Sequence, residues 1–365
     1  MKSKITFGRW EAITLLINSV CTQVFLNFPR MTVETAGTAG WIMTIYISLL
    51  AFLSFFVIYK LYKGFEGKDL LDISEYLGGK VLGIIVGLII VAFLIAVTSI
   101  VLREFAEDMK VISLVVSPIS FVTVFFVICM AAGAFFGLES IVRYHAIVVP
   151  IIAVGYLAIL IGVLPYYNAV NLTPILGTGV SDIFVKGTMR LSVFSIIILL
   201  LFITPFIGTN KNLKSIGIAG LSVSSLFLLL SSLSYISAVP YPTNTEYFLP
   251  IYHFARMINY GRFFQRIESF FVLIWAAAAF LVLSTTFFFI VYIFKKTFKL
   301  DYYRPLILPF AVLVFNCSLL PQSLMDTITL ETKYYRNYGW LFTIALSILI
   351  LLFARIKRKF QKKEA

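Results

Sequence analysis

Apolar runs of about 20 residues, the length that a helix needs to cross a bilayer, recur along the whole chain. Charged residues make up 13% of the 365 residues, against roughly 25% in a soluble domain. Within hydrocarbon every backbone N–H and C=O group must be paired inside the segment, whereas a transmembrane β-barrel would show strands of about ten residues with alternating polarity. The sequence therefore predicts an all-α polytopic membrane protein.

Ten such runs are separated by polar or Gly/Pro-containing stretches, which predicts ten transmembrane helices in a single transmembrane domain spanning residues 1–365. The predicted spans cover residues 10–28, 41–62, 81–102, 119–138, 146–164, 189–207, 216–239, 267–294, 306–320 and 340–353.

The distribution of basic residues predicts the orientation. If the N-terminus is cytoplasmic, two thirds of the Lys and Arg residues fall in cytoplasmic stretches, as the positive-inside rule requires. Both termini are then cytoplasmic, and residues 354–365 form a basic cytoplasmic tail suited to contact anionic membrane lipid. No soluble domain is long enough to present this charge to a nucleic acid, so nucleic-acid binding is not expected.

The first span is unusually polar. Residues 18–30 read NSVCTQVFLNFPR and place Asn18, Ser19, Thr22 and Gln23 in the middle of an apolar run, with Cys21 among them. Unpaired polar groups are costly in lipid, so these side chains must face protein, water or a ligand. Two interpretations stay open: hydrogen bonds that hold the helices together, or a broken helix at a binding site for a polar solute.

Ten spans divide into two halves of five, about 10–164 and 189–353. In an inverted-repeat fold the first helix of each half is the discontinuous, ligand-binding one, which makes the first and sixth spans candidates for a break. The sixth span would contribute Phe194 and Ser195 to a pocket, and Thr98 could line it from the third span.

Several short motifs occur in the order found in one known family. They are NFPR at 27–30, Gly-Trp at 40–41, RxxxE at 103–107, NLTPILGTG at 171–179, RIESFFVLIW at 266–275 and the basic tail. With these motifs the whole chain resembles the membrane-embedded B subunit of the germinant receptors of spore-forming bacteria, which is similar to amino-acid permeases of the APC superfamily.

The resemblance implies a LeuT-like 5+5 fold and the sensing of a small nutrient, typically an amino acid, in the spore inner membrane. It also implies two partners, a larger A subunit and a C lipoprotein. Where the family commonly has Gly-x-Gly in its first helix, this chain has Thr22, Gln23 and Val24, so side chains rather than freed backbone groups are expected to contact the germinant. A sugar or another small polar solute remains an alternative to an amino acid.

Charged residues near the span ends suggest a gate. Arg103 and Glu107 are spaced i, i+4 at the end of the third span, and Glu268 opens the eighth. One interpretation is a gate or a subunit contact in which Glu268 acts with Arg103. The other is an interfacial helix end covered with solvated ion pairs.

The sequence contains no Walker loop, GxSxG or HExxH motif, and no metal-spaced Cys or His cluster, so neither an enzyme nor a bound cofactor or metal is expected. The alternative function is a secondary transporter of amino acids or similar solutes. Such a transporter would need an ionisable residue inside the membrane, and the sequence shows no convincing one.

Overall fold

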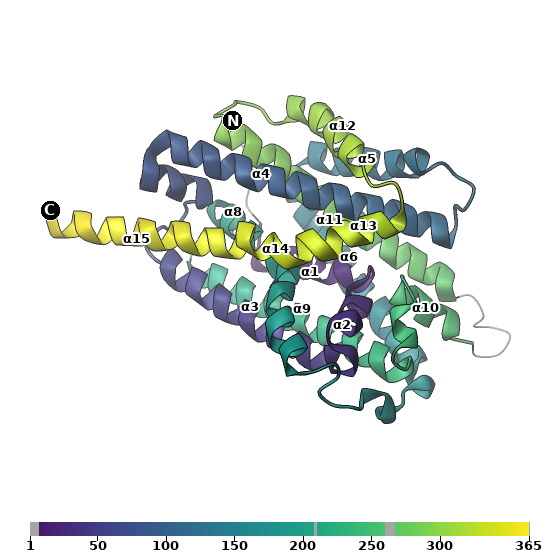
Figure 1. The fold of residues 1–365 in the computed structure, drawn as a ribbon. Helices are drawn as coiled ribbons and strands as arrows, with labels where there is room; N and C mark the ends of the chain where they lie inside the picture. Colours follow the sequence, from purple (N-terminus) through teal and green to yellow (C-terminus); the bar gives the residue numbers. More distant parts are fainter. Residues whose placement is uncertain (1–6, 208–209, 260–266, 365) are drawn as a thin grey trace.

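The structure is a computed structural model that describes residues 7–207, 210–259 and 267–364. These residues form a bundle of long helices and contain no strand (Figure 1). The helices are α1 (Arg9–Cys21), α2 (Phe28–Ala36), α3 (Gly40–Tyr62), α4 (Leu70–Ile112), α5 (Ile119–Phe136), α6 (Leu138–Gly162), α7 (Gly187–Met189), α8 (Ile198–Ile207), α9 (Asn210–Ala238), α10 (Pro250–Met257), α11 (Ile267–Thr297), α12 (Ile307–Ser318), α13 (Leu324–Leu330), α14 (Arg336–Trp340) and α15 (Leu346–Glu364).

Each of the ten predicted spans overlaps a helical segment. Within the described residues, eight helical segments are long and apolar enough to cross a membrane, which confirms a multi-pass membrane protein. The first and ninth spans correspond to α1 and α12, which have 13 and 12 residues and are too short to reach that length as continuous helices. The number ten therefore stays a prediction.

The first, sixth and eighth spans form the interior of the bundle. Every residue from Thr14 to Pro29 is buried. So is every residue from Leu191 to Thr204, which is most of the sixth span. α11 packs against α4, α5 and α6. The polar groups of the first span therefore face protein, as the cost of exposing them to lipid predicted.

α-Helical structure in the first span ends at Cys21 and resumes at Phe28. Thr22–Val24 form a 3₁₀ turn, and residues 25–27 form an irregular turn. Pro29 explains part of this change, because a proline lacks the N–H group and its ring collides with the carbonyl four residues earlier. The dihedral angles of Thr22 and Phe25 remain right-handed helical. The segment is thus tightened rather than opened, and an unwound first helix stays a prediction.

Several helices extend beyond the predicted spans, and two of these extensions bear on the site. The third span was predicted to end at Leu102, whereas α4 continues to Ile112. The tenth was predicted to begin at Trp340, whereas helical structure begins at Leu324 and passes through π-helical segments at Glu331–Tyr335 and Leu341–Ala345. Both extensions carry charged residues, which lower the local hydropathy. The buried ones are Arg103, Glu104, Asp108, Glu331 and Arg336.

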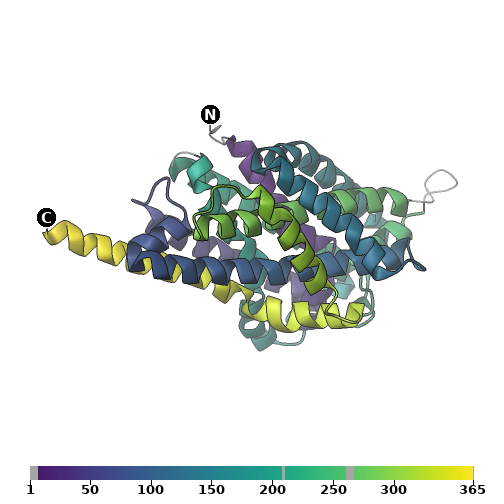
Figure 2. The ribbon, with the colours of Figure 1, turned by 90° about the horizontal axis from the view of Figure 1, so that it is seen from above.

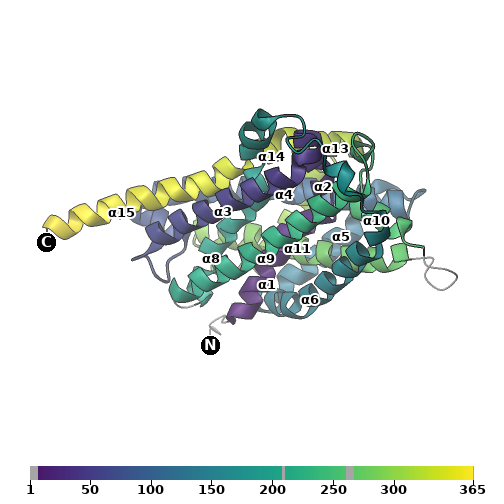
Figure 3. The same cartoon turned by 90° about the horizontal axis from the view of Figure 1, so that it is seen from below.

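The C-terminal helix α15 lies along α3 and α4 and extends past the end of the bundle, as Figure 2 and Figure 3 show. α4 is kinked at Gly78 and Gly79, where the dihedral angles leave the helical region. The ammonium group of Lys357 donates to the carbonyl oxygens of Tyr76 and Leu77, at 2.9 and 3.0 Å. Part of the basic tail therefore satisfies backbone groups that the kink leaves without helical partners.

Candidate functional site

A small cavity lies where the first, third, sixth, eighth and tenth spans meet. Its volume is about 30 Å³, and about 10 to 15 Å³ of such volume is needed to hold one water molecule. The lining residues are Ser19, Thr22, Gln23, Leu26, Val97, Thr98, Val101, Ile196, Val282, Thr286 and Tyr335.

Four of the predicted binding residues line this cavity: Ser19, Thr22, Gln23 and Thr98. The hydroxyl of Ser19 donates to the carbonyl of Leu15 at 2.7 Å, and that of Thr22 donates to Asn18 at 2.6 Å, so both are satisfied by their own helix. Thr98 differs, because its Oγ1 is buried and has no hydrogen-bond partner. A buried hydroxyl without a partner is costly, which makes Thr98 the cavity residue best able to bind a polar group.

The structure separates Asn18 and Cys21 from this group. Both line a different, largely apolar cavity of about 270 Å³, between α1, α6 and α9. The amide of Asn18 donates to the carbonyl of Ala278 at 3.3 Å, and the thiol of Cys21 lies 4.0 Å from the carbonyl oxygen of Ser224. Helical periodicity places Cys21 on the side of the helix opposite Ser19 and Gln23. Asn18 lies one turn before Thr22, and its amide is held by α11 through Ala278.

Phe194 and Ser195 are fully buried in the 3₁₀ segment Arg190–Ile197 of the sixth span. Neither belongs to the cavity lining, to which this segment contributes Ile196. Ser195 Oγ is buried without a hydrogen-bond partner. The segment nevertheless lies beside the first span, because Gln23 Nε2 donates to the carbonyl of Val193 at 3.4 Å.

A buried polar network extends from the cavity and was missed in the sequence. The guanidinium of Arg336 donates to Gln23 Oε1 and to the carboxylate of Glu331, and the amide of Asn27 donates to the other oxygen of Glu331. Glu331 and Arg336 are 0% and 1% exposed. The π-helical segment explains their pairing, because residues five apart come together in a π-helix. The sequence does show Glu331 and Arg336 close to an apolar run, but the predicted spans left both residues in the loop between the ninth and tenth spans.

These charges lie in helical segments that are long and apolar enough to cross a membrane, and the sequence alone did not identify them as buried. Glu331 and Arg336 lie in the candidate membrane-spanning segment Leu324–Gln361, and Glu104 and Asp108 are buried in the segment Leu70–Ile112.

Of the predicted gating residues, Arg103 and Glu107 form an ion pair, with 2.7 Å between the charged groups. Their side chains are 4% and 14% exposed, so the expectation of solvated ion pairs is wrong here. Glu268 lies in the first turn of α11 and is partly exposed. Among the described residues the ion-pair partner of Arg103 is Glu107 and not Glu268. Arg266, which belongs to the same motif as Glu268, lies outside the described residues.

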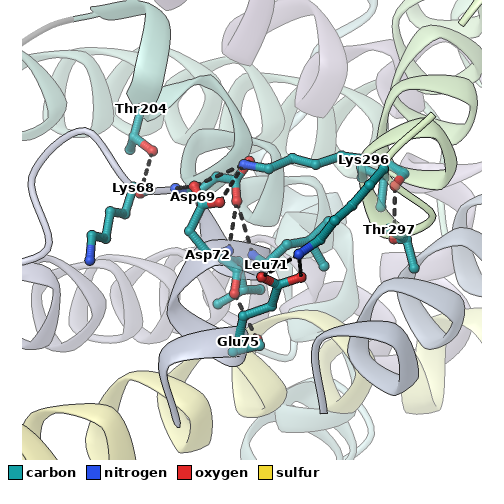
Figure 4. Close-up of polar contacts among 12 residues, drawn as sticks. Lys68, Asp69, Leu71, Asp72, Glu75, Thr204, Lys296 and Thr297 are labelled. Atoms are coloured by element: carbon teal, nitrogen blue, oxygen red, sulfur yellow. Dashed lines mark hydrogen bonds and ion pairs between the residues drawn. The ribbon is translucent and has the colours of Figure 1, made fainter. Parts of the chain in front are cut away.

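A second polar cluster joins the start of α4 to the end of α11 (Figure 4). Asp69 caps α4 by accepting hydrogen bonds from the backbone N–H groups of Leu71 and Asp72. Lys296 lies 2.5 Å from the Asp69 carboxylate and 2.8 Å from that of Asp72. Burial raises the pKa of the Asp69 carboxyl to about 6, and the nearby Lys296 ammonium opposes that shift. The cluster places two loops that were predicted to be cytoplasmic at the same end of the bundle.

Two solved structures share the fold. The first is MhsT in complex with L-phenylalanine, with a TM-score of 0.71 and 14% identity over 95% of this chain and 89% of that chain. The second is a Na⁺-coupled sialic acid symporter in a substrate-bound outward-open state, with a TM-score of 0.66 and 12% identity over 96% and 80% of the two chains. These similarities confirm the predicted LeuT-like fold class.

Three curated proteins of Bacillus subtilis (strain 168) are similar in sequence. Spore germination protein YndE is 25% identical, and spore germination protein A2 is 23% identical, each over 99% of both chains. Spore germination protein B2 is 22% identical over 76% of this chain and 75% of its own length. Residues 8–326 match the family described as spore germination protein. The chain therefore belongs to the spore germination protein family.

Proposed function

We propose that this chain is the germinant-sensing membrane subunit of a spore germination receptor, and that a small polar solute, such as an amino acid, binds in the cavity lined by Ser19, Thr22, Gln23 and Thr98. The family membership supports the sensing role. The observation that carries the location is the buried Thr98 hydroxyl, which faces this cavity without a hydrogen-bond partner. The proposed activity is binding and signalling rather than catalysis.

The size of the cavity bears on how such a site would signal. A volume of about 30 Å³ is too small for an amino acid, so the solute enters only when the surrounding spans move apart. A ligand that binds only the wider state shifts the population toward it. The Gln23–Arg336 and Gln23–Val193 hydrogen bonds would then change, because they join the first span to the tenth and sixth. In this proposal the shift passes to an A subunit and a C lipoprotein in the spore inner membrane, with both termini cytoplasmic.

The experiment is a germination assay with spores that carry Thr98→Val. The substitution keeps the shape of the side chain and removes a hydroxyl that has no protein partner, so protein abundance should be unchanged. The half-maximal germinant concentration should rise about tenfold, the effect of one lost hydrogen bond to ligand.

Thr14→Val is the matched control. Thr14 is a buried threonine that lines the other cavity, and its hydroxyl donates to carbonyls of its own helix. An unchanged response in Thr98→Val spores, or an equal shift in both variants at normal abundance, would refute the proposed location.

The alternative is a secondary transporter, and one observation favours it. The buried charges Glu104, Asp108, Glu331 and Arg336 are of the kind that transporters use to couple solute movement to an ion. Proteoliposomes that contain only this chain would separate the two functions. Saturable uptake of a labelled amino acid would overturn a role limited to sensing.

A further inference from the structure

Glu104 and Asp108 lie one turn apart on α4 and are each 2% exposed. Both interact electrostatically with Glu331, and Glu104 also interacts with Arg336. Side chains spaced i, i+4 share one face of a helix. Three carboxyl groups from the third and tenth spans thus interact electrostatically inside the bundle.

The positive charges nearby are already paired. Arg336 forms an ion pair with Glu331, and Arg103 forms one with Glu107, the other charged neighbour of Asp108. Arg190 is bonded to Thr35, Thr332 and Asn337 at the edge of the network. Tyr335 is the neutral titratable neighbour, and α5 and α12 contain no charged residue. The charged residues of α11 are Glu268 in its partly exposed first turn and Lys295 and Lys296 in its last turn, where Lys296 pairs with Asp69 and Asp72. Lys110 lies on the same helix in its last turn, but among the described residues no cation forms an ion pair with Glu104 or Asp108.

Buried hydrogen-bonding groups without a partner remain in this cluster, and they include the Nε–H donors of Arg103 and Arg336 as well as acceptor oxygens. Glu104 Oε2 and Asp108 Oδ2 are buried without a hydrogen-bond partner. Asn27 provides an independent sign: it is 2% exposed, its amide nitrogen donates to Glu331, and its Oδ1 is left without a donor. Three buried acceptor oxygens, each on a residue that interacts with Glu331, lack a donor. A proton on a carboxyl group supplies one, because a protonated carboxyl carries an O–H group.

We propose that Glu104 and Asp108 form a proton-binding site, in which the carboxyl groups are protonated at neutral pH and face the Glu331–Arg336 ion pair. Burying a carboxylate without a partner costs several kcal/mol, and such a group takes up a proton instead. The described residues include no group of three or more His, Cys, Asp or Glu side chains placed to hold a metal ion, which favours a proton over a metal cation. The site does not depend on solute binding in the neighbouring cavity.

Infrared spectroscopy of the purified full-length chain in lipid nanodiscs tests the site directly. At about pH 8, where ordinary carboxyl groups are ionised, the wild type should show the C=O stretch of a protonated carboxylic acid. The band should weaken in Glu104→Gln and in Asp108→Asn. It should be unchanged in Glu139→Gln, because Glu139 is an exposed partner of Arg143. A wild type without the band, or a band of equal strength in all variants, would overturn the proposal.

The pH dependence of thermal unfolding provides the second measurement. An unfolded carboxyl group releases its proton near pH 4, whereas the folded site keeps it, so the stability of the wild type should fall as the pH rises above about 4 relative to the Glu104→Gln/Asp108→Asn double variant. If the double variant does not fold, the infrared comparison of the wild type with the single variants and with Glu139→Gln still tests whether the carboxyl groups are protonated. Stabilisation of the wild type by NaCl at constant pH, absent with choline chloride and absent in the single variants, would show a sodium site and overturn proton binding.

Discussion

The side-chain oxygen of Gln23 accepts a hydrogen bond from the guanidinium of Arg336, a residue 313 positions further along the chain. Gln23 also lines the cavity and bonds to the sixth span through Val193. One amide side chain thus connects the candidate binding site to both the sixth and the tenth spans. A change at the cavity that displaces Gln23 must alter the contacts of both.

Replacing Gln23 with Met keeps the length of the side chain and leaves Arg336 without this acceptor. We expect a loss of about 2 kcal/mol in unfolding free energy, the cost of a buried charged donor without its partner. Thermal unfolding of the purified chain in detergent would measure it. In the matched control Thr22→Val the lost hydroxyl bonded only to its own helix, so the change should stay below about 1 kcal/mol. Equal losses in the two variants would show that the Gln23–Arg336 contact contributes nothing specific.

Breaking the buried Glu331–Arg336 pair from either side should be costly. Glu331→Gln and Arg336→Met should each destabilise the fold by about 3 to 5 kcal/mol, since each leaves the partner charge buried and unpaired. The double variant should lose much less than the sum, because it leaves neither charge behind. Additive losses in a double-mutant cycle would mean that the two groups do not depend on each other.

The Asp69 carboxyl predicts a pH dependence of stability. Its pKa in the folded chain is about 6, above the ordinary value near 4 of an unfolded chain. The folded state therefore binds the proton more tightly, and the stability that Asp69 contributes rises as the pH falls from about 6 to about 4 and is lost as the pH rises through that window. Asn also caps helices, so Asp69→Asn should keep the helix start and remove this dependence.

The measurement is the difference in melting temperature between the wild type and Asp69→Asn at several pH values. The difference should grow in favour of the wild type as the pH falls through the window. A constant difference would show that this carboxyl does not titrate there. Glu246→Gln, in an extramembrane loop, serves as the control for a general effect of removing one acidic group.

Gly177, in the NLTPILGTG stretch, docks a loop onto the turn after α2. Its φ angle is +51°, and a Cβ atom there would lie 1.9 Å from the carbonyl oxygen of Ala36. Gly177→Ala should therefore lower the unfolding free energy by well over the roughly 1 kcal/mol that a left-handed alanine costs. Gly67→Ala isolates that backbone cost, because Gly67 has φ +75° and open space around it. Similar melting temperatures for the two variants would mean that the loop yields to the added methyl group.

Much of the fold could be predicted because a membrane restricts what an apolar segment can do. The recurring runs required helices, and the polar first span required a protein environment, which its burial confirms. The sequence also indicated four residues of the cavity lining, because Ser19, Thr22 and Gln23 recur on one side of a helix that has to face inward, and Thr98 interrupts an apolar span.

The sequence by itself determined that this chain forms membrane helices and that its first span turns inward, since these follow from local composition and the cost of unpaired polar groups in hydrocarbon. Only the tertiary structure decided which polar residues meet. Asn18 and Cys21 face another cavity, while Glu331 and Arg336, which lower the hydropathy and resemble a loop, become the centre of a buried network. A charge placed far along the chain can be buried only if distant segments supply its partners, and hydropathy along the chain does not record which segments those are.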